Sequence, residues 1–390
     1  MPEIYDIKRD PQYSDERSET YRKNFYKSFY SRRDFLKNKV SGFDEKTEVL
    51  TEKGFLFFKD LNRSCRVASL VNGFLKFVKP LFLGKKKWDG LIYLIQSRSV
   101  DLVITPNLKL FYKEARHSSY SLKPISTITF QNLNLKSNCN WIGNNIDWFL
   151  IPSIKKGLNK HKIITMPQIR IKMDYWLEFL GYFLSEGSTT GYKRSGYIRI
   201  RQKRGNKRDK IRILLDKMPF RYREYESGFR INDKQLFQFL KKYGKAHEKY
   251  VPTDIKMLNI RQLKILFNSL VLGDGHISPR GYISYYTSSQ KLKDDLCEII
   301  LKIGFSPTVY TRIRQIKTDM KFARKNENAI ILKSYRPSYT INVRKSKNLK
   351  IISNKHIKKS NYSGVIYNLK VPSNIIYIRR NGKCCWCGNN

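Results

Sequence analysis

Residues 175–190 read YWLEFLGYFLSEGSTT, and residues 266–278 read LFNSLVLGDGHIS. Each stretch is an apolar run that ends in one carboxylate followed directly by glycine, at Glu186 and at Asp274. Small residues recur four positions apart ahead of each acid. They are Gly181 and Ser185 in the first stretch, and Ser269 and Gly273 in the second. Because positions four apart share one face of a helix, both stretches predict helices with a narrow stripe of small residues.

Two such stripes allow two helix backbones to pack closely, as small residues spaced four apart do in membrane helices. The two helix ends would then hold Glu186 and Asp274 side by side. Carboxylates are ligands for hard divalent cations, so the pair predicts a site for Mg²⁺ or a similar ion such as Mn²⁺. One stretch alone is more typical of a buried core helix closed by a glycine, whereas two matched stretches favour the paired arrangement.

At these residues the sequence resembles the LAGLIDADG homing endonucleases, with two degenerate copies of the motif in one chain. The acids at positions 186 and 274 stand 88 residues apart, which is enough for one half of such a protein. The resemblance implies an α+β fold with a pseudo-twofold αββαββα core, whose antiparallel sheets form DNA-binding saddles. It also implies a monomer that cuts both strands of a long target. The alternative is an ordinary α+β protein in which both helices belong to the core.

Lysine and arginine number 77 against 32 acidic residues in the 390-residue chain, a formal net charge of +45. Such an excess attracts a polyanion, and its spread over strand-like segments favours double-stranded DNA over a membrane surface. Neither apolar run approaches the roughly 20 residues that a membrane span requires. The first residues contain no apolar signal region, and six scattered cysteines suggest a reducing compartment. We therefore expect an intracellular, cytoplasmic protein.

Composition divides the chain into four segments. The first is charged and tyrosine-rich, and it predicts a basic arm that either contacts DNA or docks on its neighbour. The second and the last consist of short apolar strands separated by turns, an all-β pattern. The third contains the two motif stretches, one in each half. By residue number the segments are the arm 1–40, the strands 41–150, the two-motif region 151–350 with halves of about 170–250 and 251–350, and the strands 351–390.

The strand-rich segments at the two ends together resemble the Hint fold of inteins, interrupted by an inserted nuclease. The matching positions are TEVLT at residues 47–51, ITPN at 104–107, IYNL at 366–369 and the hairpin turn Asn381-Gly382. Protein splicing is an acyl transfer that needs a nucleophile, an acid or base, and a cyclising asparagine. The resemblance places what remains of that machinery at Ser41, Thr105 and Asn389.

Several positions depart from the splicing pattern. The departures are Gly42 at the nucleophile position with Ser41 one place out of register, Leu108 for a histidine, Asn368 and Ile375 for an aspartate and a histidine, and Asn390 where a hydroxyl or thiol residue should follow. Each has precedents in variant inteins, but together they predict a vestigial site in a scaffold that no longer splices.

Alternating strands in the two-motif region predict a basic sheet surface. Expected strands are 196–204, 224–232, 282–287, 308–314 and 338–344, with helices at 234–243 and 291–304. Arginine and asparagine on a sheet in the major groove can pair with guanine and adenine edges. The residues expected to contact DNA are Arg199, Arg201, Lys203, Arg312, Arg314, Thr340, Asn342 and Arg344. Each of these residues alone is more typical of a solvent-facing strand position. Only the whole set, together with the net positive charge, favours DNA.

Lys249 stands in EKYVPTDI, ahead of the second motif stretch. Intein-type LAGLIDADG proteins carry a lysine near the cut site in this segment, so the resemblance gives Lys249 a catalytic role. A lysine there could polarise the attacking water or offset phosphate charge, whereas a surface lysine ahead of Pro252 is the alternative. His276, two residues after Asp274, is a further candidate for DNA contact.

The CCWC cluster near the end of the chain is not expected to bind zinc. A structural zinc site commonly takes two spaced pairs of ligands, and the other cysteines supply no second pair. The cluster consists of Cys384, Cys385 and Cys387.

These features predict a site-specific double-strand DNA endonuclease without protein splicing. Glu186 and Asp274 would bind the metal ion that activates water for phosphodiester hydrolysis. One alternative is an RNA maturase that uses the same basic surface to bind intron RNA, although such relatives can lose the two acids and both are present here. The other alternative is a self-splicing intein.

Overall fold

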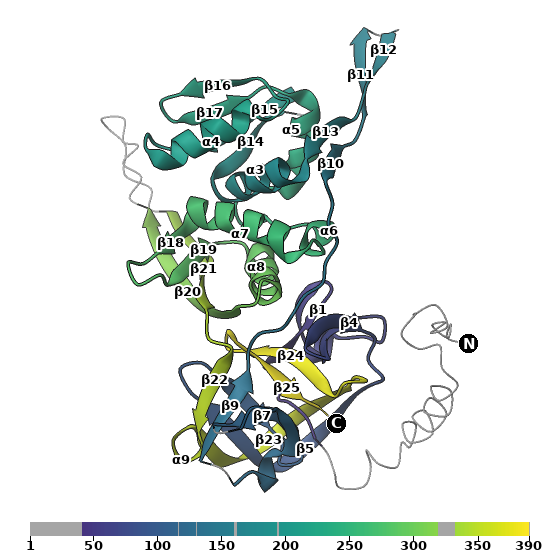
Figure 1. The fold of residues 1–390 in the computed structure, drawn as a ribbon, viewed down its shortest axis with the longest axis vertical. Helices are drawn as coiled ribbons and strands as arrows, with labels where there is room; N and C mark the ends of the chain where they lie inside the picture. Colours follow the sequence, from purple (N-terminus) through teal and green to yellow (C-terminus); the bar gives the residue numbers. More distant parts are fainter. Residues whose placement is uncertain are drawn as a thin grey trace, which may run out of the picture.

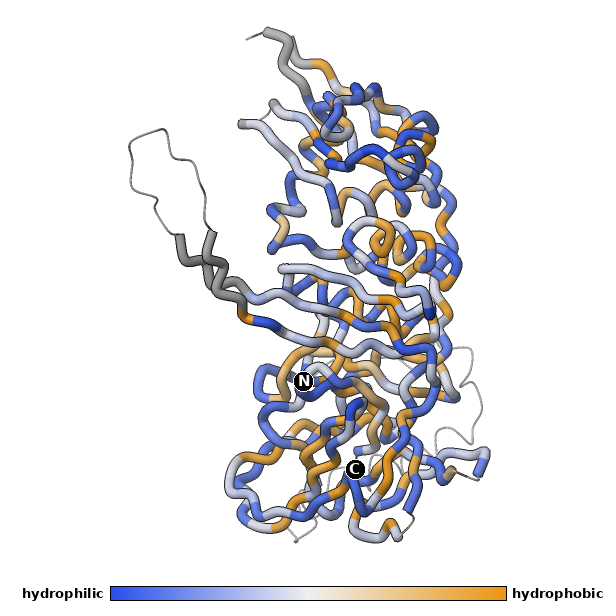
Figure 2. Tube along the Cα trace, turned by 90° about the vertical axis from the view of Figure 1, so that its left-hand side faces the viewer, coloured by the Kyte–Doolittle hydropathy of each residue, from blue (hydrophilic) through white to orange (hydrophobic). Residues whose placement is uncertain are grey.

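The computed structural model describes residues 41–115, 117–129, 131–159, 162–192, 195–318 and 332–389. It shows a mixed α+β protein with mainly antiparallel sheets, arranged in three tiers along the long axis (Figure 1 and Figure 2). The upper two tiers are similar halves of helices and strands, and the lowest is an all-β unit. The arm expected over residues 1–40 lies outside the described residues. Within the described ranges, no helix is both long and apolar enough to span a membrane.

Both ends of the chain build the all-β unit, because strands from after residue 347 pair with strands from before residue 137. The pairs are β23 (Ile357–Lys370) with β5 (Phe82–Gln96), β24 (Ile375–Arg380) with β1 (Thr47–Thr51), and β22 (Asn348–Ile352) with β9 (Asn132–Lys136). Val49, Ile104 and Ile378 are fully buried in the shared core. Neither end could bury its apolar side chains without the other.

The other elements of the all-β unit are short. They are β2 (Gly54–Phe57), η2 (Phe58–Asp60), β3 (Val67–Val71), β4 (Phe74–Val78), β6 (Asp101–Ile104), β7 (Lys109–Glu114), β8 (Ser121–Pro124), η3 (Ile125–Thr127), α9 (Ser353–His356) and β25 (Lys383–Gly388).

A narrow ribbon of paired strands leads into the first half and projects from the molecule (Figure 1). Its pairs are β10 (Trp148–Ile151) with β13 (Ile169–Lys172), and β11 (Ile154–Asn159) with β12 (Lys162–Met166). The Gln235 side-chain amide fastens the base of the ribbon by donating to the carbonyls of Pro152 and Pro167, at 2.7 and 2.9 Å.

The first half begins with α3 (Met173–Glu186). Its further elements are β14 (Gly187–Tyr192), β15 (Ser195–Arg201), α4 (Asn206–Asp216), β16 (Tyr222–Tyr225), β17 (Gly228–Ile231), α5 (Lys234–Leu240), η4 (Lys241–Tyr243) and α6 (Thr253–Lys256). The four strands form one sheet in the order β14-β15-β17-β16. Alternation along β15 buries Ile198 and Ile200 in the core, so Arg199 and Arg201 lie on the other face.

The second half begins with α7 (Ile260–Asp274). Its further elements are β18 (Gly275–Ile277), β19 (Ile283–Thr287), α8 (Gln290–Lys302), β20 (Ser306–Thr318) and β21 (Leu332–Arg344). These strands follow the order β18-β19-β21-β20, which is the order of the first half. The two halves therefore repeat one α-β-β-α-β-β unit, and each repeat begins with a motif helix.

The sequence pattern misses parts of this repeat. It does not predict α4, because NKRDKIRILLD is dominated by charge and buries only a few apolar side chains. It also misses β14 and β18, which are rich in small and polar residues. The single strand expected over 224–232 is the hairpin β16–β17. Gly228 follows its turn with a φ of 131°, a conformation that glycine adopts without steric cost.

The second half and the all-β unit share one continuous sheet, because β20 pairs with β25. The Val309 amide donates to the Gly382 carbonyl at 2.8 Å. Beside this pairing, the buried Arg379 guanidinium donates to the Glu48 carboxylate at 2.6 and 2.7 Å and forms an ion pair with Asp294 of α8. The junction therefore joins the two units through backbone pairing and buried charge.

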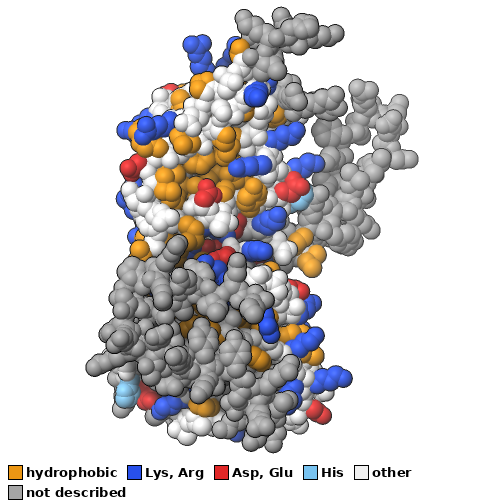
Figure 3. All heavy atoms as spheres, turned by 90° about the vertical axis from the view of Figure 1, so that its right-hand side faces the viewer, with side chains coloured by type: hydrophobic (Ala, Val, Ile, Leu, Met, Phe, Trp, Pro, Cys, Tyr) orange, Lys and Arg blue, Asp and Glu red, His pale blue; other side chains and the backbone are white. Residues whose placement is uncertain are grey.

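Basic side chains are spread widely over the molecule. On the face in Figure 3, lysines and arginines are scattered, and hydrophobic side chains gather in the upper half. Trp148 and Leu150 of β10 are 39% and 47% exposed. The lysines and arginines drawn in this view thus do not form one continuous patch.

Candidate functional site

Helices α3 and α7 pack against each other at their small residues. A Cβ added at Gly181 would lie 2.1 Å from Ser269 Oγ, and one added at Gly273 would lie 2.4 Å from Ser185 Cβ. Neither position has room for a methyl group, because protein interiors are close-packed. The Ser185 hydroxyl also donates to the Leu270 carbonyl across the contact, at 3.3 Å. The structure thus brings the two stripes together, with glycine against serine in both directions.

This packing brings the two acids close to each other. Glu186 is the last residue of α3, Asp274 is the last residue of α7, and both are half-buried. Burial and the negative charge of Asp274 raise the pKa of the Glu186 carboxyl. Burial also raises the pKa of Asp274, while Lys207 and Lys249 oppose that rise. The site therefore holds two electrostatically strained carboxylates with basic neighbours.

Lys249 lies behind the end of α3 and is only 2% exposed, so it is not the surface lysine of the alternative interpretation. Its Nζ donates to the carbonyls of Phe183 and Gly187 at 2.6 and 2.8 Å. Burial lowers the pKa of Lys249 to about 7, against the opposing effect of Asp274. Lys249 therefore holds the end of α3, and with it Glu186, in position.

Lys207 is a further member of the site, and the sequence pattern does not reveal it. It stands in the first turn of α4, and its Nζ donates to the Gly273 carbonyl at the end of α7, at 3.1 Å. Its positive charge opposes the rise that burial causes in the pKa of both Glu186 and Asp274. The signal that could have found it is Gly205, because glycine is a common residue directly ahead of a helix.

The acid pair fits a hard divalent cation. Carboxylate oxygens are ligands that Mg²⁺ accepts, and a bound cation would offset the burial that raises the pKa of both acids. No group of three or more His, Cys, Asp and Glu side chains within the described part of the chain is placed to hold a metal ion. The remaining ligands would therefore be backbone carbonyls, water or groups of a bound substrate.

The basic residues expected on the first sheet lie near this site. Arg199 and Arg201 stand on the face of β15 opposite the core, and Lys203 is exposed just beyond the strand. Arg199 lies opposite Arg230 of β17, and Arg230 lies opposite Arg223 of β16. Sequence alternation identified the first strand, but the cross-strand arginines depend on the hairpin register.

The second sheet contains four of the expected residues with described side chains. Arg312 is exposed, and Thr340 and Asn342 are half-buried on the same face. The side chain of Arg314 lies outside the described residues.

The side chain of Arg344, also expected to contact DNA, is hydrogen-bonded within the protein. Its guanidinium donates to Thr308 Oγ1 at 2.9 Å, to Ser99 Oγ and to the Arg98 carbonyl. Ser99 and Arg98 belong to the all-β unit, so the side chain is already engaged in joining the two units.

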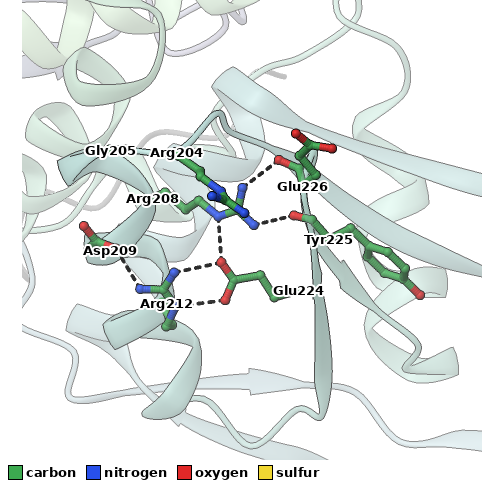
Figure 4. A pocket seen from close by; sticks show the side chains of 8 residues that line it. All are labelled: Arg204, Gly205, Arg208, Asp209, Arg212, Glu224, Tyr225 and Glu226. Carbon is green, nitrogen blue, oxygen red and sulfur yellow. Dashed lines mark hydrogen bonds and ion pairs between the residues drawn. The ribbon is translucent and has the colours of Figure 1, made fainter.

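A hollow beside α4 is lined by side chains that form ion pairs with one another (Figure 4). The buried Arg208 donates to Glu224 and to the backbone carbonyls of Tyr225 and Glu226, and Arg212 also pairs with Glu224. These bonds fix the β16–β17 hairpin against α4, so we assign this hollow a structural role.

The two chain ends meet around Ser41, which is fully buried. Asn368 Nδ2 donates to Ser41 Oγ at 3.3 Å, and the Gly42 amide donates to Thr105 Oγ1 at 2.9 Å. A Cβ at Gly42 would lie 2.4 Å from the Tyr367 carbonyl oxygen. No side chain fits at position 42, so Ser41, and not position 42, presents the hydroxyl here.

Other positions of the splicing pattern carry apolar or unpaired groups. Leu108 is a fully buried core residue, and Ile375 packs against the core. Asn389 is fully buried, and its side-chain amide has no hydrogen-bond partner within the described residues. The cluster thus contains the hydroxyls of Ser41 and Thr105 and the Asn368 amide, while the two positions that the splicing pattern gives to histidines are apolar.

No protein-family model matches the chain. One similar protein is an ATP-dependent Clp protease proteolytic subunit of Chlamydomonas moewusii, 26% identical over 278 residues, which cover 67% of this chain and 28% of that protein. Another is a DNA-directed RNA polymerase subunit beta C-terminal section of Stigeoclonium helveticum, 25% identical over 398 residues, covering 88% of this chain and 36% of that protein. The chain thus spans about a third of the length of these curated relatives.

Among solved structures, the AceL NrdHF class 3 split intein, in a GSH-linked splice-inactive variant, is similar over 34% of this chain and 77% of that chain. The identity is 14% and the TM-score is 0.21. At this TM-score the likeness is slight, and the architecture of the all-β unit rests on the strand pairings described above.

Proposed function

We propose that this chain is an intein-like element whose central part is a LAGLIDADG-type endonuclease that cuts both strands of DNA at one long site. The contact of α3 with α7 at Gly181 and Gly273, which sets Glu186 beside Asp274, carries the proposal. Each acid directly precedes the first strand of its own sheet, and the two sheets have the same strand order. A repeated unit with one acid in each half suits a duplex, in which two antiparallel strands each need one cut. Because one chain supplies both acids and both sheets, a monomer suffices.

The sequence relatives support the intein-like part of the proposal. A protease subunit and an RNA polymerase subunit are unrelated in activity, yet this chain resembles about a third of each. A segment common to two such proteins is best explained as an element inserted into different hosts. The all-β unit, built from both chain ends with two similar halves between them, is the arrangement that insertion of a nuclease into a Hint-type unit would produce.

The side chains around the acids have separate roles in the proposed reaction. A Mg²⁺ or Mn²⁺ ion held by Glu186 and Asp274 would activate a water molecule and stabilise charge on the phosphate. Lys249 and Lys207 hold the ends of α3 and α7, so that the two carboxylates keep their separation. Lys207 also places positive charge where phosphate charge would increase. The basic sheet faces would bind the DNA backbone and the major-groove edges of the bases.

The test is cleavage of a randomised duplex library by the full-length chain in Mg²⁺. We expect cuts at one long site that disappear in Glu186→Gln and in Asp274→Asn. The matched control is Asp60→Asn, which removes an exposed acid of the all-β unit and should cut as the parent does. Tight, salt-sensitive binding without any cut would contradict the nuclease and favour binding of a nucleic acid such as intron RNA.

A second candidate is self-processing at the ends of the all-β unit, favoured by the buried contact between Ser41 and Asn368. The apolar Leu108 and Ile375 disfavour it, because no acid or base occupies those positions. Mass spectrometry of the purified full-length chain decides the matter. Fragments that begin at Ser41 or end at Asn389, absent from Ser41→Ala and Asn389→Ala respectively, would support processing. A single intact mass would contradict it.

A further inference from the structure

The two halves present different side chains at equivalent sheet positions. In the first half, one row across the sheet runs Ser188, Arg199, Arg230 and Arg223. In the second half, the equivalent row runs His276, Ser284, Asn342 and Thr308. Each row begins two residues after a motif acid, so both rows lie next to the proposed cut site. Three arginines in the first half thus correspond to serine, asparagine and threonine in the second.

The arginine row is costly in the free protein. Like charges directly opposite each other on neighbouring strands destabilise a sheet. Within the described residues, no ion pair is recorded for Arg199, Arg223 or Arg230. An array of donors with no acidic partner is suited to an external acceptor that carries negative potential, such as the major-groove edge of guanine together with nearby phosphates.

Part of this row is already ordered for contact. The Arg230 guanidinium lies 3.8 Å from the centre of the Tyr197 ring, and its Nε donates to Asn232 Oδ1 at 2.9 Å. The two Nη groups have no recorded partner within the described residues. These are the groups that bind guanine O6 and N7 together, and a stacked guanidinium loses less freedom when it binds.

The equivalent row of the second sheet contains no arginine or lysine of its own, and Arg344 reaches it only at Thr308. Ser284 Oγ donates to Asn342 Oδ1 at 2.8 Å, which orients the amide and leaves Nδ2 without a recorded partner. Thr308 is covered, because it is 2% exposed and accepts from Arg344. Tyr286 and Tyr310, on the same face, are 48% and 41% exposed. An oriented amide pairs with adenine N6 and N7, and the exposed tyrosine rings offer apolar contact to the methyl group of thymine.

We propose that the target is asymmetric, with G·C pairs against the β14–β17 sheet and A·T pairs against the β18–β21 sheet, on either side of the cut. This inference rests on the proposed nuclease function and names its substrate more closely. Arg199 and Arg230 read guanine on the first side, and Asn342 reads adenine on the second. The first half also makes the larger contribution to the salt dependence of binding, because its contacts are charged.

The experiment is selection of bound and cleaved duplexes from a randomised library by the full-length chain. We expect sites with G·C pairs in one half and A·T pairs in the other. Arg199→Gln and Arg230→Gln should weaken base preference only in the G·C half, and Asn342→Ala only in the A·T half. In each case the discrimination against the wrong base should fall by about 5- to 150-fold. Arg63→Gln, an exposed arginine of the all-β unit, should leave both halves unchanged.

The outcomes separate the two proposals. A selected and cleaved site of equal composition on both sides, or arginine variants that relax the same half as Asn342→Ala, would overturn the asymmetric target and leave the nuclease standing. Absence of both a selected site and cleavage would overturn the nuclease and this inference together.

Discussion

The close contact of α3 with α7 makes Gly181→Ala the most informative substitution. The new Cβ would lie 2.1 Å from Ser269 Oγ, 2.8 Å from Ser269 Cβ and 3.0 Å from the Leu270 amide nitrogen. Overpacking typically costs about 1–3 kcal/mol, and contacts this short place the cost near about 3 kcal/mol. Alanine regains about 1 kcal/mol in helix propensity. We therefore expect the free energy of unfolding to fall by about 2 kcal/mol.

The function should fall further than the stability. The contact sets the separation of Glu186 and Asp274, and misplacement of reacting groups by about 1 Å can cost roughly 100-fold in rate. Urea unfolding measures the first effect, and single-turnover cleavage of the selected duplex measures the second. Asn268→Ala, an exposed position on α7, is the matched control and should change stability by less than about 0.5 kcal/mol.

The double variant Gly181→Ser with Ser269→Gly tests the geometry directly. It exchanges the two small residues across the contact and keeps the total volume, so we expect it to recover most of the stability that Gly181→Ala loses. If Gly181→Ala is as stable as the parent, or if the exchange recovers nothing, the helices do not pack at these residues and the account of the acid pair is wrong.

Three further predictions concern charge. Arg379→Ala should lower the free energy of unfolding by about 3–5 kcal/mol, because it leaves Asp294 at the buried junction without this partner; urea unfolding measures it. Burial lowers the pKa of Lys249 to about 7. Burying the charged ammonium therefore destabilises the folded protein fully below pH 7, and this destabilisation disappears as the pH rises towards 10.5. The free energy of unfolding of the parent in urea, relative to that of Lys249→Met, should therefore increase between pH 7 and 10. Without metal, Glu186→Gln and Asp274→Asn should each unfold at a higher temperature than the parent at neutral pH, because one desolvated charge is gone. Mg²⁺ should stabilise only the parent, by about 2.7 kcal/mol at 100 times its Kd, and less as the pH falls towards the raised pKa of the acids.

Local patterns in the chain were sufficient to locate the centre of the candidate site. Gly181 and Ser185 share a helix face because of the helical repeat, and the following acid and glycine mark the end of each helix. Lys207 escaped the same reasoning, because its place beside the acids depends on α4, a charge-rich helix without a strong apolar period. Arg344 was placed on the correct strand, but its side chain is engaged by the all-β unit.

The sequence by itself determined the paired motif helices, the all-β character of both chain ends and the alternation that exposes Arg199 and Arg201. These features depend on residues a few positions apart, and helix and strand periods are properties of short segments. Only the tertiary structure decided that Arg230 lies between Arg199 and Arg223, and that Ser284 lies opposite Asn342. Cross-strand neighbours depend on where each hairpin turns and on which strands pair, and those pairings join residues up to 58 positions apart. The physical reason is that register is a non-local property, fixed by the shared core and not by the composition of either strand.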